Sequence, residues 1–252
     1  MPFIDLGGLT LALGLLTFLA AGTVKGTLGI GLPLVAVPLL ATVFDLPTAV
    51  ALMVVPVLAS NIIQALKGKR KIATFRRFLP LLLTLIPGTV IAAQFLSSVN
   101  LRTGSLVLGV IVVLFSLSQL VRFDFEVNKK HERYLNPIVG LFAGFLGGLS
   151  NLFGPPLIMY LVTLKLEKDD FVTTIGFLFV IAAVTLYTTL ATVGILSLEN
   201  ATASLVAAIP VMAGVFIGTR LRDRIHQKTF ERALMIVLIF VGLNLIRRGW
   251  LG

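Results

Sequence analysis

The sequence predicts an all-α polytopic membrane protein built as an inverted repeat. In each half we expect a helical hairpin broken by glycine and proline, followed by three transmembrane helices. An apolar composition, a series of long apolar runs and two similar glycine- and proline-rich breaks predict this fold. Of the 252 residues, 57% are hydrophobic and 13% are charged, and the mean hydropathy is +1.03. A water-soluble domain carries roughly 25% charged residues, so this chain lacks the surface that would keep it in water.

The net charge of +10 and the pI of about 10.4 would suggest a nucleic-acid partner for a soluble protein. In a membrane protein, lysines and arginines more often anchor cytoplasmic loops, so we expect lipid contacts and no nucleic acid. The chain has no cysteine, which excludes disulfides and thiol catalysis. Because no basic residue precedes Lys25, the start lacks the positive region of a cleavable signal peptide, and we expect the first apolar stretch to be retained.

Six continuous apolar runs are each long enough to cross a hydrocarbon core of about 30 Å. They cover residues 47–66, 78–97, 103–121, 171–194, 200–219 and 230–248. We expect each run to form a complete transmembrane helix.

Two further apolar regions, 8–44 and 135–164, are interrupted. The interruptions are Gly26, Gly29, Gly31 and Pro33 in the first region, and Gly147, Gly148, Gly154, Pro155 and Pro156 in the second. A downstream piece such as 32–44 would rise only about 20 Å as a helix, which is too short to span. Each region is therefore expected to be a hairpin of one longer and one shorter helix.

The two broken regions also resemble each other. Gly31, Pro33 and Leu34 are each followed 123 positions later by an identical residue, and so is Pro87. The chain is therefore interpreted as a duplication, with one repeat over 1–126 and the other over 127–252, together forming one transport domain.

Loop charges predict the orientation of these repeats. If the loops 67–77, 122–134, 165–170 and 220–232 share one side, that side holds 17 of the 21 lysines and arginines. By the positive-inside rule that side is cytoplasmic and both termini are periplasmic. Three crossings then carry each hairpin to the opposite side, so the halves are inverted, as in many secondary transporters.

The breaks themselves predict an anion site. Non-helical backbone is tolerated in a membrane only where it is buried in protein or lines a cavity. In both breaks a proline follows a glycine where a short helix should begin. Two helix N-termini, each carrying about half a positive charge, favour a small anion, and glycine allows close approach to the backbone. The alternative is that the glycines only allow close helix packing.

The sequence offers polar partners for such an anion. The candidate substrate-binding residues are Lys25, Gly29, Gly31, Asn61, Ser150, Asn151 and Gly154. Lys25 has no acidic residue near it in sequence, and an intramembrane charge is costly without a partner; alternatively, it snorkels to the cytoplasmic interface. Asn151 is either a ligand contact or a helix cap.

All 11 aspartates and glutamates lie in loops or at segment ends, and both histidines lie in loops. Any proton coupling would therefore use an acid at a segment end, Lys25, or protons carried by the substrate. An intramembrane enzyme would need a nucleophile with a base, or a metal cluster. The sequence shows neither, so we expect no catalytic residues, no metal and no cofactor.

With about 250 residues, two related halves, and breaks of the form GTLGIGLPL and GGLSNLFGPPL, the sequence resembles the sulfite exporter TauE/SafE family of membrane permeases. The resemblance covers nearly the whole chain. It implies a transporter of sulfite, sulfonates or other organic anions in the bacterial inner membrane. A passive anion channel is the alternative. The sequence does not predict the exact anion, the direction of transport, the coupling ion or the oligomeric state.

Overall fold

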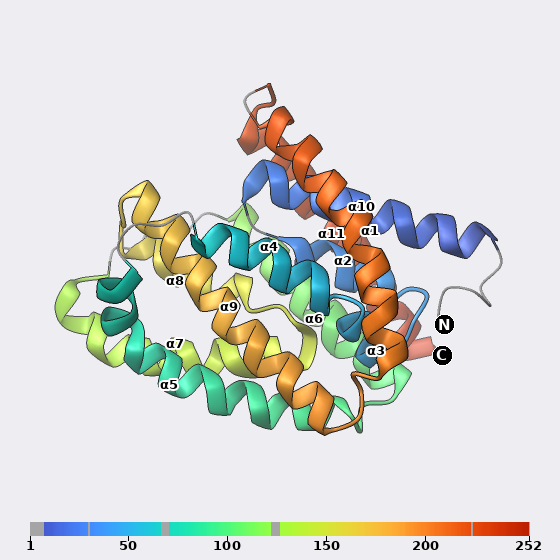
Figure 1. Cartoon of the computed structure of the whole chain (residues 1–252), viewed down its shortest axis with the longest axis horizontal. Helices are drawn as coiled ribbons and strands as arrows, with labels where there is room; N and C mark the ends of the chain where they lie inside the picture. Colours follow the sequence, from blue (N-terminus) through green and yellow to red (C-terminus); the bar gives the residue numbers. More distant parts are fainter. Residues whose placement is uncertain (1–7, 30, 67–70, 122–126, 223, 252) are drawn as a thin grey trace. The chain divides into compact units, whose positions relative to one another are not determined.

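The computed structural model describes residues 8–29, 31–66, 71–121, 127–222 and 224–251, in which the regular secondary structure is α-helical (Figure 1). Six segments of this described part are long and apolar enough to cross a membrane. They are Leu46–Leu66, Arg76–Leu96, Leu101–Leu120, Asp170–Thr192, Leu198–Leu221 and Lys228–Leu251. The six spans expected from the apolar runs are therefore confirmed.

The first of these spans departs from the expected single helix. It consists of α3 (Leu46–Ala51) and α4 (Val54–Leu66), separated by a two-residue turn. Pro56 has no N–H, and a proline ring clashes with the carbonyl four residues earlier, here that of Leu52. The Val55 N–H donates instead to Ser204 Oγ at 3.0 Å, so the interrupted backbone is satisfied by a side chain.

Both broken regions form the expected pair of a long and a short helix. In the first, α1 (Gly8–Leu28) is followed by α2 (Leu32–Leu40). In the second, α7 (Lys129–Ser150) is followed by α8 (Gly154–Thr163). The short helices begin at the glycine and proline positions because proline is tolerated in the first turn of a helix.

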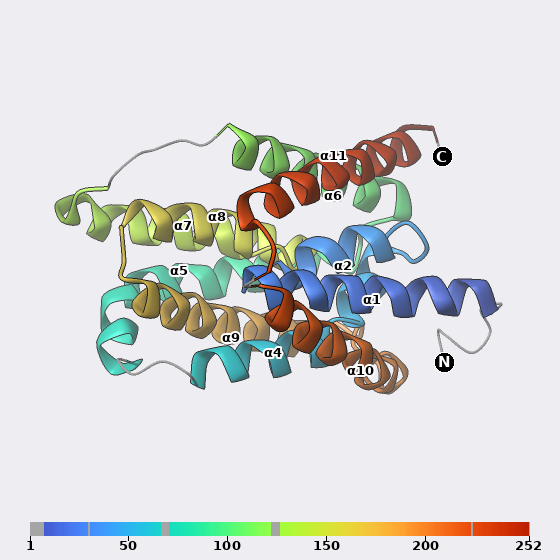
Figure 2. The same ribbon diagram turned by 90° about the horizontal axis from the view of Figure 1, so that it is seen from above.

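The chain packs as two compact units, and each takes segments from both halves of the sequence. Unit 1 comprises 1–56, 98–123 and 195–252. It contains α1, α2, α3, α6 (Leu101–Leu120), α10 (Leu198–Leu221) and α11 (Gln227–Leu251). Within it, α1 packs along α10, and α6 packs along α11 (Figure 2).

Unit 2 comprises 57–97 and 124–194. It contains α4 from Val57 onward, α5 (Lys71–Leu96), α7, α8 and α9 (Lys168–Thr192). Within it, α5 packs along α7, and α9 contacts α5, α7 and α8.

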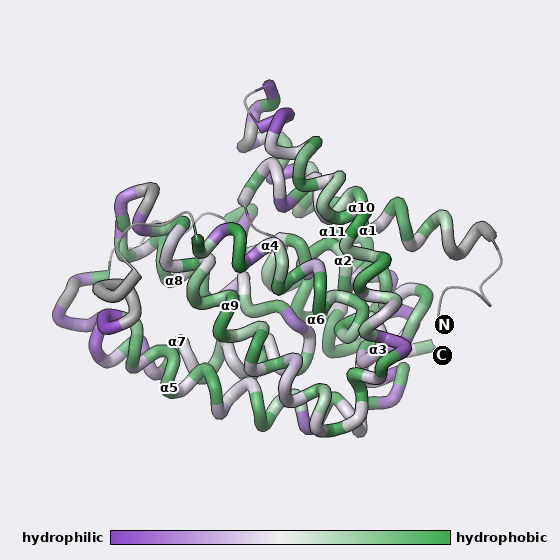
Figure 3. The backbone as a smooth tube through the Cα atoms, viewed as in Figure 1, coloured by the Kyte–Doolittle hydropathy of each residue, from purple (hydrophilic) through white to green (hydrophobic). Residues whose placement is uncertain are grey.

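The surface of the spans is apolar, as lipid contact requires. Leu83, Leu114, Ile209 and Phe240 are each more than 60% exposed, whereas the segment between α10 and α11 is hydrophilic (Figure 3). Exposed apolar patches of this extent are rare on soluble monomers. With the six spans, they identify a multi-pass membrane protein.

Candidate functional site

The first break depends on two glycines. α1 ends at Leu28, and the Gly29 N–H donates to the Lys25 carbonyl at 2.7 Å. Gly29 has a φ of +79° and Gly31 a φ of +95°. Side chains strain such left-handed conformations. These two glycines therefore let the chain leave α1 and enter α2 within a few residues.

Lys25 lies one turn before this break and is buried, with 7% of its surface exposed. Its neighbour Thr27 donates through Oγ to the Gly218 carbonyl of α10 at 3.2 Å. The break therefore lies beside the last turn of α10, near one end of the α1–α10 pair.

A second cation, Arg222, reaches this break from the end of α10. Its Nε donates to the Thr27 carbonyl at 2.9 Å, and its Nη2 lies 3.3 Å from the position that a Cβ on Gly29 would occupy. The last carbonyls of a helix lack backbone partners and carry partial negative charge, so Arg222 caps α1. The sequence placed Arg222 in a cytoplasmic loop, and nothing in its spacing indicates a partner 195 positions away.

The short helices offer fewer backbone donors than the sequence interpretation assumed. Pro155 and Pro156 have no N–H, which leaves Gly154 as the only donor among the first three residues of α8. The first three residues of α2 include one proline, Pro33, and therefore keep two donors. The helix-end attraction for an anion is consequently weaker at the second break.

The second break is closed by an asparagine. Asn151 follows α7 in the left-handed region, with a φ of 61°, and its N–H donates to the Gly147 carbonyl at 2.7 Å. Asparagine tolerates this conformation better than most residues with side chains. Asn151 therefore caps the C-terminus of α7 through its backbone, which leaves its side chain available for other contacts.

The Asn151 amide is buried, with 2% of the residue exposed. Its Nδ2 donates to Tyr187 Oη of α9 at 2.8 Å. Its Oδ1 is buried and has no hydrogen-bond partner in the described part of the chain. A buried acceptor without a donor costs about 1–3 kcal/mol, so this atom is suited to a ligand or a water.

Two other candidate residues, Ser150 and Asn61, are also buried. Ser150 is fully buried, and its Oγ donates to the Leu146 carbonyl of its own helix at 2.7 Å. The Ser150 hydroxyl proton is therefore engaged within the helix and is not available to an anion. Asn61 is buried in α4, with 4% of its surface exposed.

The glycines of the breaks have separate roles. A Cβ on Gly26 would overlap the Val215 carbonyl of α10, and a Cβ on Gly148 would lie 2.6 Å from the Thr89 carbonyl of α5. These two serve close helix packing. At Gly154 a Cβ would meet only Ile158 Cδ1 at 3.3 Å and Phe179 Cζ at 3.6 Å. Packing alone thus explains Gly26 and Gly148 but does not require glycine at 154.

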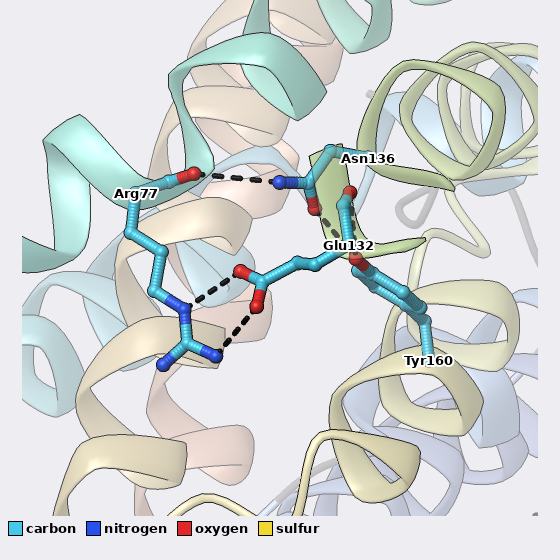
Figure 4. Close-up of polar contacts among 4 residues, drawn as sticks. All are labelled: Arg77, Glu132, Asn136 and Tyr160. Atoms are coloured by element: carbon cyan, nitrogen blue, oxygen red, sulfur yellow. Dashed lines mark hydrogen bonds and ion pairs between the residues drawn. The ribbon is translucent and has the colours of Figure 1, made fainter. Parts of the chain in front are cut away.

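A polar cluster in which Arg77 is partly exposed and Glu132, Asn136 and Tyr160 are buried lies away from the break in unit 2 (Figure 4). Arg77 donates to both carboxylate oxygens of Glu132, at 2.7 and 2.8 Å, and Tyr160 Oη donates to Asn136 Oδ1 at 2.8 Å. Asn136 Nδ2 in turn donates to the Arg77 carbonyl at 3.4 Å. The charge pattern predicts a loop position for Glu132, but this residue lies in the first turn of α7 and is 8% exposed. The cluster ties α5, α7 and α8 together.

The seven candidate residues are divided between the units. Lys25, Gly29 and Gly31 belong to unit 1, and Asn61, Ser150, Asn151 and Gly154 belong to unit 2. The candidates proposed from the sequence include neither Arg222 nor Tyr187. Among the described residues, no group of three or more His, Cys, Asp or Glu side chains is placed to hold a metal ion.

The sequence model of one protein family, described as sulfite exporter TauE/SafE, matches residues 14–245. The match includes both breaks and all the spans except the last residues of α11. No curated protein and no solved structure matches the chain.

Proposed function

The chain belongs to the sulfite exporter TauE/SafE family of membrane transporters, and we propose that it moves a small anion, sulfite or an organosulfonate, across the bacterial inner membrane by alternating access. Transport, rather than catalysis, follows from the family. The choice of anion, the mechanism and the residues that bind the anion are our proposal.

Reciprocal helix packing supports the inverted repeat. Gly22 and Gly26 of α1 pack against the Val211 and Val215 carbonyls of α10. In unit 2, Gly144 and Gly148 of α7 pack in the same way against the Leu85 and Thr89 carbonyls of α5. The two glycines of α7 each follow those of α1 by 122 positions, and the two carbonyls of α10 each follow those of α5 by 126.

The reverse contact obeys the same two offsets. Gly214 of α10 packs against the Leu19 carbonyl of α1, and Gly88 of α5 packs against the Leu141 carbonyl of α7, where an added Cβ would lie 2.7 Å from the carbonyl oxygen. Each pair therefore takes one helix from each half of the chain. By these offsets α7 is equivalent to α1, and α10 is equivalent to α5. Packing of each helix against a helix of the other half is typical of inverted-repeat transporters.

Cysteine labelling tests the inversion directly, because the chain has no cysteine of its own. Arg76 lies at the start of the α5 span and Asn200 at the start of α10. In an inverted repeat, Arg76→Cys should label from the cytoplasm and Asn200→Cys from the periplasm. Labelling of both from one side would exclude the inverted repeat.

The first break is proposed to attract the anion through positive charge. Lys25 and Arg222 both lie at the end of α1, and Gly29 and Gly31 leave the backbone beside them without side chains. Charge-assisted hydrogen bonds are roughly twice as strong as neutral ones. We assign Lys25 to the anion rather than to the lipid interface because it is buried.

The second break supplies neutral polar contacts from Asn151 and Tyr187, with Gly154, Ser150 and Asn61 as further candidates. Rotation of the Asn151 amide by 180° about its Cβ–Cγ bond would let Tyr187 Oη donate to Oδ1. The Nδ2 donors would then point where the unpaired oxygen lies. The amide can thus accept a hydrogen bond from a protonated anion in one orientation and donate one to a deprotonated anion in the other.

The buried, unpaired Oδ1 of Asn151 is the observation that carries this assignment. The test is uptake of radiolabelled sulfite, supplied below its KM, into proteoliposomes by the parent and by Asn151→Gly, because glycine adopts a φ of 61° without strain. Gln119→Ala is the control because it removes an amide from α6, which carries no residue of either break. We expect Asn151→Gly to lose most uptake while Gln119→Ala retains it; equal loss in both, or in neither, would contradict the assignment.

The same vesicles distinguish a transporter from a channel. Unlabelled sulfite inside should accelerate entry of labelled sulfite if the protein alternates between two states, because the loaded protein returns faster. A channel would show no such acceleration and would pass a current in proportion to the gradient.

A further inference from the structure

Three arginines gather at one end of unit 1, away from the first break. Arg102 lies in the first turn of α6, and Arg247 and Arg248 lie near the end of α11. α6 and α11 run antiparallel, and a Cβ on Gly249 would lie 2.7 Å from the Arg102 carbonyl. The packing thus brings the start of one helix beside the end of the other. These are also the three arginines that the charge pattern separates from the basic loops.

Two surface cavities of about 390 and 410 Å³ lie at this end. Thr42, Asn244, Arg247, Arg248 and Leu251 line the first. Asn100, Leu101, Arg102, Ser105 and Arg248 line the second. Arg248 thus lines both cavities, and neither is lined by an acidic side chain. The lining consists of cations, hydrogen-bonding groups and two leucines.

Arg248 is fixed in place. Its Nη1 donates to the Ala41 carbonyl at 3.2 Å and to the Thr42 carbonyl, both at the end of α2. Its Nε and Nη2 make no hydrogen bond within the described part of the chain. A guanidinium held in this way still has donors in a planar fork, the geometry that suits tetrahedral oxyanions.

The start of α6 adds to the positive potential of the second cavity. Asn100 Oδ1 accepts from the Thr103 N–H at 2.8 Å, and the N–H groups of the first turn carry partial positive charge.

An exposed tryptophan indicates how deep this end lies in the membrane. Trp250 follows Arg248 by two residues and is 79% exposed. Tryptophan is enriched where lipid headgroups meet water. The arginines beside it therefore lie at the level of the headgroups, where phosphate groups are concentrated.

We propose that this arginine-lined end of α6 and α11 is a binding site for a tetrahedral oxyanion, supplied by the phosphate of an anionic lipid or by a free oxyanion in solution. Arg102 and Arg248 hold the oxyanion in one cavity, and Arg247 and Arg248 hold it in the other. This site shares no residue with the two breaks, so it does not depend on the transported substrate.

The test uses the full chain, purified in detergent and freed of lipid. Dioleoyl phosphatidylglycerol is titrated in native mass spectrometry, with dioleoyl phosphatidylcholine as the zwitterionic comparison, and inorganic phosphate is titrated by calorimetry. We expect the anionic lipid to bind in preference to the zwitterionic one. Arg102→Gln and Arg247→Gln should each weaken its binding at least tenfold, the scale of one lost charge-assisted contact.

Arg224→Gln is the matched control, because Arg224 is exposed in the turn between α10 and α11. It should bind like the parent. Arg248→Gln should abolish binding, and its melting temperature must be compared with that of the parent because Arg248 also caps α2. If that variant does not fold, the other two decide.

Binding of the anionic lipid without binding of inorganic phosphate would identify the lipid as the source. Binding of both would identify a general oxyanion site. Equal binding of the two lipids with no binding of phosphate, or parental binding by both Arg102→Gln and Arg247→Gln, would overturn the proposal.

Discussion

The two helical hairpins are packed alike but broken differently. α1 against α10 and α7 against α5 use glycines that face the carbonyls of the partner helix at matching positions. At the ends of α1 and α7 this likeness stops. The first break uses Gly29 and Gly31 and has Lys25 and Arg222 beside it, whereas the second uses Asn151 and has Tyr187.

The two breaks share their backbone conformation and differ in their side chains. In both hairpins the backbone must leave a long helix and start a short one inside an apolar protein, and in both it does so through residues in the left-handed conformation. Both breaks share these left-handed residues because backbone polar groups inside a membrane protein must be satisfied in both places. The side chains beside the breaks are not common: one break concentrates positive charge and the other neutral donors and acceptors. We infer that the first break mainly determines affinity for charge, and the second determines which shape and protonation state is accepted.

The largest expected effect concerns the shared packing. A Cβ on Gly26 would overlap the Val215 carbonyl, and one on Gly148 would lie 2.6 Å from the Thr89 carbonyl. Gly26→Val and Gly148→Val should each destabilise the protein by about 3 kcal/mol, the upper range for overpacking, and lower its melting temperature. A parental melting temperature in either variant would mean that the two pairs do not pack alike.

The next effect concerns the charge at the first break. Lys25→Met keeps the length of the buried side chain but removes its ammonium. It should weaken sulfite binding by about 2 kcal/mol, roughly thirtyfold, the scale of a lost charge-assisted contact. Isothermal titration of parent and variant measures this. Lys71→Met, at the start of α5, is the control for the loss of one positive charge elsewhere; if it reduced affinity as much, net charge rather than the break would govern binding.

The second break should give a smaller change. Asn151→Gly removes the amide yet keeps a residue that adopts a φ of 61° without strain. Loss of a neutral hydrogen bond should weaken sulfite binding by about 1 kcal/mol, roughly fivefold. Tyr187→Phe removes only the hydroxyl that meets the amide, so it should reproduce part of this loss. An Asn151→Gly protein with parental affinity would assign the amide to structure alone.

The sequence predicted those parts of this comparison that are local. Apolar runs gave the six spans, and glycine followed by proline gave the starts of α2 and α8, because length, hydropathy and turn chemistry depend on neighbouring residues. Proline alone was a poorer guide. Pro56 interrupts its span, whereas Pro80 and Pro87 lie inside a continuous α5, and the outcome depends on whether neighbouring helices satisfy the freed groups.

The parts that involve distant residues could not be predicted. Arg222 meets Thr27 across 195 positions, and Tyr187 meets Asn151 across 36. Each pair joins residues in or next to different helices, so tertiary packing alone brings them together. The same limit applies to Glu132. Its charge suggested a loop, but its bidentate pair with Arg77 allows burial at the start of α7.

The smallest expected effect distinguishes the glycines at the starts of the two short helices. Gly154 does not have a positive φ, and its Cβ would meet only Ile158 and Phe179 side-chain atoms, at 3.3 and 3.6 Å. Gly154→Ala should therefore keep the parental melting temperature. Gly31 has a φ of +95°, so Gly31→Ala should cost about 1 kcal/mol of stability through backbone strain.

Transport then shows whether Gly154 meets the anion. A methyl group placed between the anion and the Gly154 N–H would lengthen one of the few backbone contacts available, because Pro155 and Pro156 donate none. Gly154→Ala should thus raise the KM for sulfite about threefold, a loss of roughly 0.6 kcal/mol, within the range of a weakened neutral hydrogen bond. Initial rates of uptake into proteoliposomes measure it, with the melting temperature as the check on folding. If Gly154→Ala transports with the parental KM while Asn151→Gly does not, the anion contacts the Asn151 side chain and not the start of α8, and the two breaks differ in backbone as well as side-chain recognition.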